Sequence, residues 1–474
     1  MNRGSSSRSS RIATPKPDDT IAAISTPFGE SGIGIVRISG SLAESIAKRL
    51  FRYKKEQSSF ISHYFHYGEI IDPKSGNPVD EVLIVLMKSP RTYTREDIIE
   101  IQCHGGCFIL QKVLELVLRE GARLAQPGEF TKRAFLNGRI DLTQAEAVID
   151  LIRARTQTSL EISNQQLRGV LYREMTELRS RLVERLALIE AHIDFPEEEI
   201  EPIAFRELKA DFKRMVRQMD EWVASYEEGR IFREGISCAI VGKTNVGKSS
   251  LLNVLLKEER AIVTPIPGTT RDVIEELFNI HGIPVRLMDT AGLRKPGDSI
   301  EREGVRRAKE RVAESDIVLL MLDGSRELDA DDFEIFGEIK GKKGIVIINK
   351  KDLRRRISLE EVKSQFKDEP IVLISALKNE GIDDLKKTIY RSLVHQNIRV
   401  TPEHLIVANI RHKIALTQAR DNLFSAFKGL EEGTSHEFIA FEIRSVLDAL
   451  GEMVGETATE EVLNRIFEQF CIGK

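Results

Sequence analysis

The residues best suited to chemistry form one run with the spacing of a Walker A loop, Gly242-Lys243-Thr244-Asn245-Val246-Gly247-Lys248-Ser249. In such a loop the glycines let backbone N–H groups turn toward phosphates, the lysine reaches the β- and γ-phosphates, and the last hydroxyl ligates Mg²⁺. An apolar run precedes the loop at 236–241, and a helical pattern follows it at 250–256. This order of strand, loop and helix predicts a site for a nucleoside triphosphate.

Three further motifs follow strand-like runs in the order expected of a guanine nucleotide site. They are Asp289-Thr290-Ala291-Gly292, Asn349-Lys350-Lys351-Asp352 and Ser375-Ala376-Leu377. The first motif places a second acidic residue behind the Mg²⁺ shell. In the second motif, the Asp352 carboxylate can accept from the N1 and N2 donors of guanine, which adenine lacks. A glycine-rich turn that arose by chance would not be followed by these motifs in this order. The sequence therefore predicts GTP rather than ATP as the ligand.

Length and composition indicate several domains and a reducing compartment. A chain of 474 residues is too long for one core, and usual domain sizes suggest about two to four domains. The four cysteines are too few and too scattered for a disulfide framework. A net charge of −4 gives no overall attraction to nucleic acid, so an RNA contact would need a local basic patch. No apolar run approaches the roughly 18 residues of a membrane span, so we expect a cytoplasmic protein without a membrane contact.

The sequence favours neither a zinc site around His104 nor a transit peptide at residues 1–19. Cys103, His104 and Cys107 offer only three potential zinc ligands, which favours a role without metal. Residues 1–19 are rich in Ser and Arg, faintly like a transit peptide, but they have no amphipathic helical period. We therefore expect a disordered leader.

The hydrophobic pattern predicts two different α and β segments. In residues 20–134, short β-rich runs at 33–38, 79–87 and 98–103 alternate with helical patterns, which is typical of an α+β domain. Residues 235–395 alternate between strands and helices, as in an α/β domain that holds its ligand at the carboxyl ends of a doubly wound sheet.

The remaining segments are predicted to be helical. Residues 135–234 carry an apolar stripe from Leu167 to Ile193, which predicts one long helix, and a second helical stretch at 205–230. Residues 396–474 are helical again. Neither half has enough partners to cover its own apolar face. We therefore expect one all-α domain, built from both halves, into which the α/β domain is inserted.

Longer motifs near both ends of the chain resemble the MnmE (TrmE) family of tRNA modification GTPases. They comprise Gly32-Ile33-Gly34-Ile35-Val36-Arg37-Ile38-Ser39-Gly40, the Pro-Gly-Glu-Phe-Thr-Lys-Arg run at 127–133, Asp141-Leu142-Thr143-Gln144-Ala145-Glu146-Ala147 and the terminal Phe470-Cys471-Ile472-Gly473-Lys474. The central string Gly268-Thr269-Thr270-Arg271-Asp272 is similar to that of the translation-associated GTPases, which include Era and EngA.

Two other functions predict different features. A ribosome-assembly switch like Era or EngA would carry a KH-like Gly-x-x-Gly loop after residue 395 or a second Walker A loop, and the sequence contains neither. A folate-dependent enzyme that uses GTP only as a structural ligand predicts negligible hydrolysis.

The resemblance implies a homodimer with an N-terminal tetrahydrofolate-binding and dimerisation domain, a split helical domain and a Ras-like P-loop GTPase domain. With the flavoprotein MnmG (GidA), as a heterotetramer, the family adds an aminomethyl or carboxymethylaminomethyl group to C5 of the wobble uridine, position 34, of certain tRNAs. The one-carbon unit is attributed to 5-formyl- or 5,10-methylene-tetrahydrofolate, and FAD and NADH come through MnmG. Dimerisation of the GTPase domains drives hydrolysis and the conformational cycle.

The resemblance also implies site residues. GTP contacts map to Asn245, Val246, Gly247, Lys248, Ser249, Ser250, Thr264, Pro265, Ile266, Pro267, Gly268, Thr269, Thr270, Asp289, Thr290, Ala291, Gly292, Asn349, Lys350, Lys351, Asp352, Ser375, Ala376 and Leu377. Potassium maps to Asn245, Thr264, Ile266 and Thr269, and Mg²⁺ maps to Ser249 and Thr270. No glutamine follows Gly292, and the family's catalytic glutamate maps to Glu301, with Glu303 as a rival.

Folate contacts map to Arg37, Glu100, Arg139 and Lys474. Position 139 is usually lysine in the family and is arginine here, which changes the hydrogen-bonding geometry. Cys471 fits two interpretations, a thiol that takes part in the modification chemistry or a small residue docked in a pocket.

Overall fold

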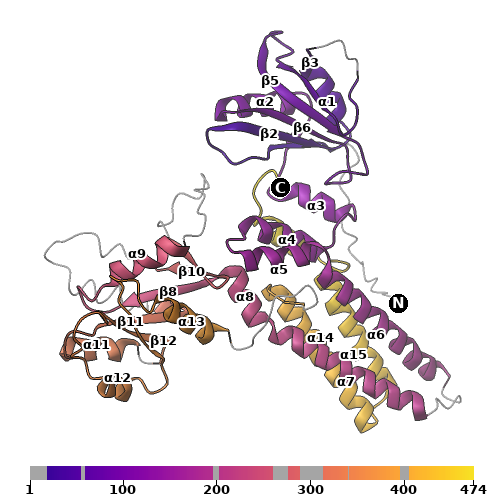
Figure 1. Cartoon of the computed structure of the whole chain (residues 1–474). Helices are drawn as coiled ribbons and strands as arrows, with labels where there is room; N and C mark the ends of the chain where they lie inside the picture. The colour runs from indigo at the N-terminus through magenta and orange to yellow at the C-terminus, as the bar shows by residue number, and fades with distance from the viewer. Residues whose placement is uncertain are drawn as a thin grey trace, which may run out of the picture.

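A computed structural model of the chain describes residues 19–54, 59–195, 202–259, 276–288, 313–339, 341–394 and 405–474. An N-terminal α+β domain, a bundle of long helices and an α/β domain are separate bodies in Figure 1. The predicted fold class is confirmed. Among the described residues, no helix is both long and apolar enough to cross a membrane.

The N-terminal domain is a seven-stranded sheet covered on one face by two helices. Its strand order is β3-β4-β5-β6-β2-β1-β7, antiparallel except for the pair β1 and β7. The elements are β1 (Ile21–Ile24), β2 (Ser31–Ser39), α1 (Ala43–Leu50), β3 (Phe51–Tyr53), β4 (Phe65–Ile71), β5 (Pro78–Met87), β6 (Ile98–Gly105), α2 (Cys107–Arg119) and β7 (Arg123–Leu124). One core joins both helices to the sheet, so the strands predicted at 33–38, 79–87 and 98–103 are confirmed.

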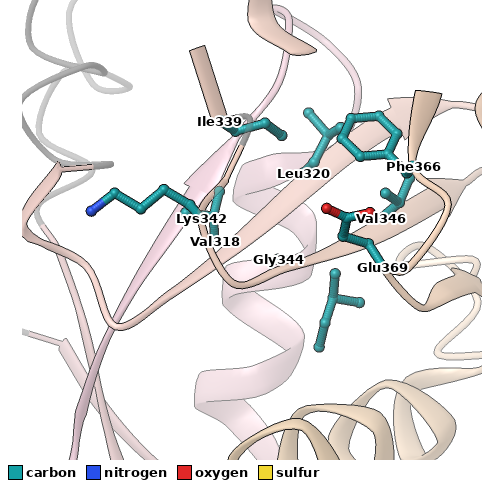
Figure 2. A pocket seen from close by; sticks show the side chains of 9 residues that line it. Val318, Leu320, Ile339, Lys342, Gly344, Val346, Phe366 and Glu369 are labelled. Atoms are coloured by element: carbon teal, nitrogen blue, oxygen red, sulfur yellow. The ribbon is translucent and has the colours of Figure 1, made fainter. Parts of the chain in front are cut away.

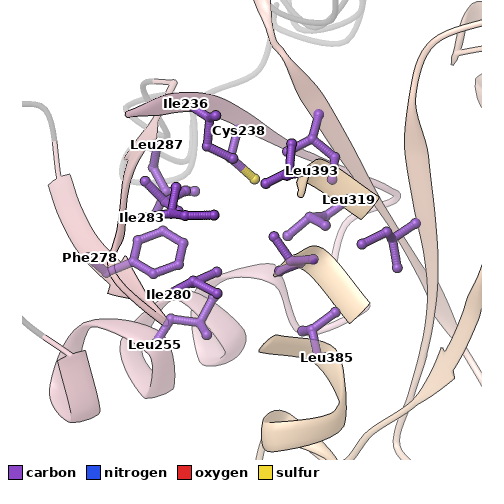
Figure 3. Packing of buried hydrophobic residues seen from close by; sticks show 14 of the residues in the cluster. Ile236, Cys238, Leu255, Phe278, Ile280, Ile283, Leu287, Leu319, Leu385 and Leu393 are labelled. Carbon is purple, nitrogen blue, oxygen red and sulfur yellow. The ribbon is translucent and has the colours of Figure 1, made fainter. Parts of the chain in front are cut away.

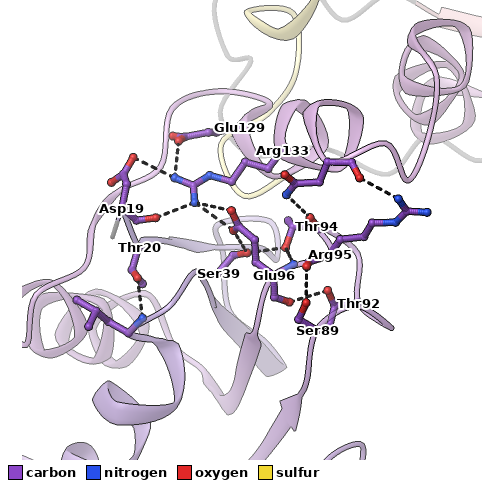
Figure 4. A network of polar contacts seen from close by, with 12 residues as sticks. Asp19, Thr20, Ser39, Ser89, Thr92, Thr94, Arg95, Glu96, Glu129 and Arg133 are labelled. Atoms are coloured by element: carbon purple, nitrogen blue, oxygen red, sulfur yellow. Dashed lines mark hydrogen bonds and ion pairs between the residues drawn. The ribbon is translucent and has the colours of Figure 1, made fainter. Parts of the chain in front are cut away.

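A buried arginine fixes helix α3 (Glu129–Leu136) to this domain (Figure 4). Arg133 is 2% exposed, and its guanidinium donates to the Asp19 carbonyl at 2.8 Å and to the carboxylates of Glu96 and Glu129 at 3.1 Å. A buried cation is tolerated only when it is paired and hydrogen-bonded. The cluster therefore determines where the chain leaves the sheet for the helical domain.

The helical domain is assembled from segments on both sides of the α/β domain. The first segment contributes α4 (Leu142–Arg153), α5 (Gln157–Leu167), α6 (Val170–Asp194), α7 (Pro202–Ala224) and α8 (Tyr226–Glu234), and the second contributes α14 (Ile410–Glu432), α15 (His436–Val454) and α16 (Glu460–Phe467). Helix α6 packs against α15, and α7 packs against α14. Residues from all four helices share one core, so the predicted insertion is confirmed.

Two helix predictions were wrong in detail. The apolar stripe does not begin a long helix at Leu167, because α5 ends there and Gly169, at φ 74°, starts α6. The stretch predicted at 205–230 is two helices that meet at Ser225. The Ser225 hydroxyl donates to the Trp222 carbonyl at 2.7 Å and accepts from the Val407 N–H at 3.1 Å. The break between α7 and α8 therefore depends on a hydrogen bond from Val407, which lies 182 residues from Ser225.

The α/β domain has a six-stranded sheet of order β13-β12-β11-β8-β10-β9, parallel except for β9. Its elements are β8 (Ile236–Val241), α9 (Lys248–Glu259), β9 (Glu276–Ile280), β10 (Ile283–Leu287), β11 (Ile317–Asp323), α11 (Ala330–Ile339), β12 (Gly344–Asn349), α12 (Leu359–Gln365), β13 (Ile371–Leu373) and α13 (Ile382–Leu393). The parallel strands bring their carboxyl ends, and the motifs that follow them, to one edge.

The core of the α/β domain continues into the helical domain. Figure 3 shows part of this core, between the sheet, α9 and α13. Ile162 of α5 and Phe232 of α8 belong to the same cluster. At the turn between β9 and β10, the Gly282 carbonyl accepts from the Thr156 hydroxyl at 2.8 Å, and a Cβ at Gly282 would lie 2.2 Å from Thr158 Oγ1. The two domains therefore meet in a close contact that only glycine allows.

A buried carboxylate joins the two segments of the helical domain. Glu146 of α4 is 5% exposed and accepts from Arg411 at 2.7 and 2.9 Å, from His412 Nε2 at 2.6 Å and from Asn409 Nδ2 at 3.1 Å. Burial alone would raise the pKa of Glu146, but the interactions with His412 and Arg411 outweigh burial and lower it. The ionised carboxylate is thus part of the folded structure.

We predict that Glu146→Ala lowers the free energy of unfolding of the helical domain by about 3–5 kcal/mol, because it leaves the Arg411 guanidinium and the buried His412 and Asn409 side chains without this acceptor. Trp222, the only tryptophan in the chain, is buried in the core of this domain, so its fluorescence during urea unfolding measures the change. A carboxyl with a lowered pKa stabilises the fold above its ordinary value of 4.5 and loses that contribution as pH falls through the folded pKa. The difference between wild type and variant should therefore shrink only in acid.

The control for this prediction is Glu456→Ala. Glu456 pairs with Arg179 at the surface, with its side chain half exposed, and such pairs contribute about 0–1 kcal/mol. Equal stability losses in the two variants would contradict the assigned role of Glu146.

Candidate functional site

The predicted phosphate loop has a backbone that requires its glycines. Gly242 and Gly247 have φ of 146° and 107°, and a Cβ at either position would lie 2.2 Å from another atom, the Met321 carbonyl oxygen or Asn349 Nδ2. Asn245 has a left-handed backbone, with φ of 62°. The loop thus turns back sharply between the end of β8 and the start of α9.

Lys248 lies across this loop at the start of α9. Its ammonium donates to the carbonyls of Gly242 at 2.6 Å and Lys243 at 2.5 Å, and burial lowers its pKa. Ser249 and Ser250 are exposed in the first turn of α9, whereas Val246 is buried. A cation together with the free N–H groups of a helix N-terminus is suited to holding a phosphate chain.

Asn349 connects the phosphate loop to both predicted base-reading motifs. It is 4% exposed, its Nδ2 donates to the Val246 carbonyl at 2.8 Å, and its Oδ1 accepts from the Ala376 N–H at 3.0 Å. Loops that follow three different strands are therefore held at fixed distances from one another.

The Asp352 carboxylate is oriented by a buried serine. Ser375 Oγ donates to Asp352 Oδ1 at 2.6 Å, and this hydrogen bond holds the pKa of Asp352 below its usual range. Lys351 and Leu377 are exposed, and the Lys350 ammonium pairs with Asp323. The Asp352 carboxylate is thus held ionised by its neighbour, and its role in reading the base stays a prediction.

Several predicted site residues lie outside the described residues. They are Thr264, Pro265, Ile266, Pro267, Gly268, Thr269, Thr270, Asp289, Thr290, Ala291, Gly292 and the catalytic candidates Glu301 and Glu303. Of the predicted ion ligands, the structure describes Asn245 for potassium and Ser249 for Mg²⁺. Strand β10 ends at Leu287 beside β8, with the Met288 N–H donating to the Cys238 carbonyl at 3.1 Å, and so carries the chain to the edge where the phosphate loop lies.

Sequence reasoning missed the contact that fixes the first half of the phosphate loop. The Lys243 ammonium pairs with Asp332 at 2.9 Å and with Asp329, both at the start of α11. The Asp332 carboxylate also accepts from the Asp329 N–H at 3.1 Å, as a cap would. In the sequence these aspartates look like ordinary helix-start residues, and nothing local indicates a lysine 89 residues earlier as their partner.

The predicted folate residues of the N-terminal domain converge on the C-terminal tail. Arg37 and Glu100 face each other on β2 and β6 and form an ion pair at 2.7 Å. Arg37 Nη1 and Ser25 Oγ both donate to the Gly473 carbonyl, at 3.4 and 3.2 Å. Gly473 has φ of 97°, and a Cβ there would lie 2.4 Å from the Ile24 carbonyl oxygen. Burial and the Arg37 charge lower the pKa of the adjacent Lys474.

Arg139 and Arg37 both lie beside Tyr93. Arg139 Nη1 donates to the Tyr93 carbonyl at 3.1 Å, and the Arg139 guanidinium lies 4.7 Å from the centroid of the Tyr93 ring. The Arg37 guanidinium lies 5.9 Å from the same centroid. Sequence reasoning missed Tyr93, because a single aromatic residue in a loop forms no periodic pattern. Together the residues offer cations, a carboxylate and an aromatic ring, which suit a planar ligand with carboxylates.

The cysteines near these residues have different environments. Cys471 is exposed, and its carbonyl accepts from the Gly128 N–H at 3.4 Å, so the tail is also attached near α3. Cys103 lies in the core of the N-terminal domain, while the neighbouring His104 directs Nδ1 to Asp80 at 2.7 Å.

Figure 2 shows a pocket in the α/β domain that is distinct from these sites. It is lined mainly by apolar side chains of β11 and β12, with Phe366 and Glu369 beside them. None of the motif residues lines it, so we assign it no role in binding.

Comparisons with known proteins agree over nearly the whole chain. Family descriptions "GTP-binding protein TrmE N-terminus" and "MnmE helical domain" match residues 20–139 and 142–471. The tRNA modification GTPase MnmE of Thermoanaerobacter pseudethanolicus is 50% identical over 458 residues, which cover 96% of this chain and 99% of that protein. That of Geobacter sulfurreducens is 49% identical, with the same coverage. A solved structure of Aquifex aeolicus Era with GDP and aluminium fluoride is 32% identical, covers 40% of this chain and 66% of its own, and has a TM-score of 0.28.

We predict that Asp352→Asn lowers the affinity for GTP roughly 10- to 100-fold, because a charged acceptor is lost. Xanthosine triphosphate carries an oxygen at C2, to which the amide of the variant can donate. The affinity of Asp352→Asn for this nucleotide should therefore exceed that of the wild type. Calorimetric titration measures the Kd for each of the two nucleotides. Asp368→Asn removes an equal charge from an exposed position in the same domain and should change neither affinity. An unaltered preference for GTP in Asp352→Asn would show that another residue reads the base.

Proposed function

Because this chain belongs to the family of the tRNA modification GTPase MnmE, a GTP hydrolase of tRNA modification, we propose that it modifies C5 of the wobble uridine. The observation that supports this proposal best is the presence of two separate sites in one chain. Asn349 unites the phosphate loop with the base-reading loops, and the C-terminal tail completes a polar site on the N-terminal domain. An enzyme that couples GTP hydrolysis to transfer of a one-carbon unit needs both.

At the GTP site we propose that Lys248 binds phosphate and that Ser249 and Thr270 ligate Mg²⁺. Potassium is bound by Asn245 together with Thr264, Ile266 and Thr269, and it supplies the positive charge that an arginine finger supplies in other GTPases. Glu301 positions the attacking water, because no glutamine follows Gly292.

At the N-terminal site we propose that Arg37, Glu100, Arg139 and Lys474 bind 5-formyl- or 5,10-methylene-tetrahydrofolate. The guanidinium groups suit the glutamate carboxylates, and Glu100 suits the N–H donors of the pteridine. The chain acts in the cytoplasm as a homodimer. The homodimer forms a heterotetramer with MnmG, and FAD and NADH come through MnmG. The product is an aminomethyl or carboxymethylaminomethyl group at position 34 of certain tRNAs, and Cys471 is positioned near the folate.

We predict that a strain lacking this chain loses the aminomethyl and carboxymethylaminomethyl groups from its wobble uridines. Mass spectrometry of nucleosides from purified tRNA measures this loss. Re-expression of the wild-type chain or of Glu456→Ala should restore the modified nucleosides, and re-expression of Asp352→Asn should not. Unchanged wobble uridines in the deletion strain would refute the proposed function.

We also predict that GTP hydrolysis is faster in potassium than in sodium and that Asn245→Ala removes this difference. The variant should lower kcat in potassium by about 10²-fold, the loss typical of one preorganised electrostatic contact. Its Kd for GDP should stay within a few-fold of wild type. Asn253→Ala, an exposed asparagine on α9, is the matched control. Equal rates in the two salts for the wild-type chain would exclude a catalytic potassium ion.

A further inference from the structure

Asp323, the last residue of β11, belongs to none of the motifs identified in the sequence. Its side chain is 8% exposed. Oδ1 accepts from the Ser325 N–H at 3.0 Å and from the Ser325 hydroxyl at 2.6 Å, while Oδ2 accepts from Lys350 Nζ at 2.5 Å. The exposed Arg326 lies 3.6 Å away. Both oxygens of this carboxylate are therefore committed, and Lys350 is its one partner from another loop among the described residues.

The Lys350 side chain joins the ends of two neighbouring strands. Asp323 lies opposite Asn349 in the parallel ladder of β11 and β12, and the Gly324 N–H donates to the Asn349 carbonyl at 2.9 Å. Lys350 follows Asn349 with a left-handed backbone, φ 64°. Its side chain thus starts at the end of β12 and ends at the end of β11. The four methylene groups must cross the edge of the sheet where the strand ends meet.

The first and last residues of the motif that contains Lys350 are fixed independently. Asn349 is bonded to the phosphate loop and to Ala376, and Asp352 is bonded to Ser375. The methylene stem of Lys350 therefore lies between a loop suited to phosphates and a carboxylate suited to a base. A purine placed between those two groups would meet the stem with its flat face.

A free lysine side chain loses rotamer entropy when it is held in one conformation. Asp323 removes this penalty before a ligand arrives, because the side chain is already held by its ammonium group, and preorganisation of this kind increases affinity. The pairing also neutralises the ammonium and leaves an apolar stem for the base. Burial alone would raise the pKa of Asp323, but hydrogen bonds from Lys350 and Ser325 outweigh it and lower the pKa. The Asp323 carboxylate is therefore ionised at neutral pH.

We propose that Asp323 is a positioning residue of the nucleotide site, which acts through Lys350 to hold one wall of the base-binding region. This proposal rests on the proposed GTP site and adds to it a residue whose role is independent of the guanine-reading Asp352. The wall contacts the face of the purine, so it contributes equally to the binding of any purine nucleotide that the site accepts. Asp352, in contrast, distinguishes purines by their edge.

The test is a double-mutant cycle measured by calorimetry on the full-length chain, with GDP and inosine diphosphate as ligands. Asp323→Asn should raise the Kd for both ligands about tenfold and leave their ratio unchanged. Lys350→Met, which keeps the stem and removes the ammonium, should have a similar effect. The double variant should bind no more weakly than Lys350→Met alone, because Asp323 acts through that ammonium. Asp331→Asn, an exposed aspartate on the following helix, is the control and should bind both ligands within twofold of wild type.

A Kd for GDP that is unchanged in Asp323→Asn would overturn the proposal. So would losses that add fully in the double variant, because additivity would assign Asp323 a structural role without Lys350. A changed ratio between GDP and inosine diphosphate would also overturn it, since it would place the effect at the edge of the base. If the wild-type chain did not bind GDP, the proposed function itself would fail, so the two failures are distinguishable.

Discussion

The ion cluster around Glu146 is the constraint on which the arrangement of the domains depends. It joins α4 to the start of α14, residues 265 positions apart, and both chain segments that flank the α/β domain pass close to it. Asp150, one turn further along α4, pairs with Arg233 of α8 at 2.8 Å. Because α8 leads directly into β8, this second pair fixes the entry to the α/β domain, and Arg411 fixes the helix that follows its exit. Buried charges accept few alternative arrangements, since each unpaired group would be strongly destabilising.

The close contacts at the domain junction follow from these fixed ends. The turn between β9 and β10 meets the start of α5 at Gly282, and one apolar cluster contains residues of both domains. The α/β domain is therefore attached at its entry, at its exit and at one edge of its sheet. At the carboxyl ends of β12 and β13, Asn349 and Asp352 are held beside the phosphate loop that follows β8.

The N-terminal domain is held by contacts with the opposite end of the chain. A Cβ at Gly128 would lie 2.6 Å from the Phe467 carbonyl oxygen, and one at Gly473 would lie 2.4 Å from that of Ile24. These close approaches of backbone to backbone bring the tail against the end of β1 and the start of α3, with its Gly473 carbonyl within reach of Arg37. The polar site of this domain is thus made from both ends of the chain, and neither end could form it alone.

The sequence by itself determined the elements and motifs whose physics is local. The spacing of Gly242, Gly247 and Lys248 predicts a phosphate loop because it sets the turn by itself, and the stripe in α6 follows from residue periodicity. Family motifs added the group of Arg37, Glu100, Arg139 and Lys474, which the structure brings together. Only the tertiary structure decided the partners of Lys243, Lys350 and Ser225, the position of Tyr93 between two arginines, and the end of α5 at Leu167. Each of these depends on a contact across many residues or on a single glycine turn, and hydrophobic periodicity carries no information about either.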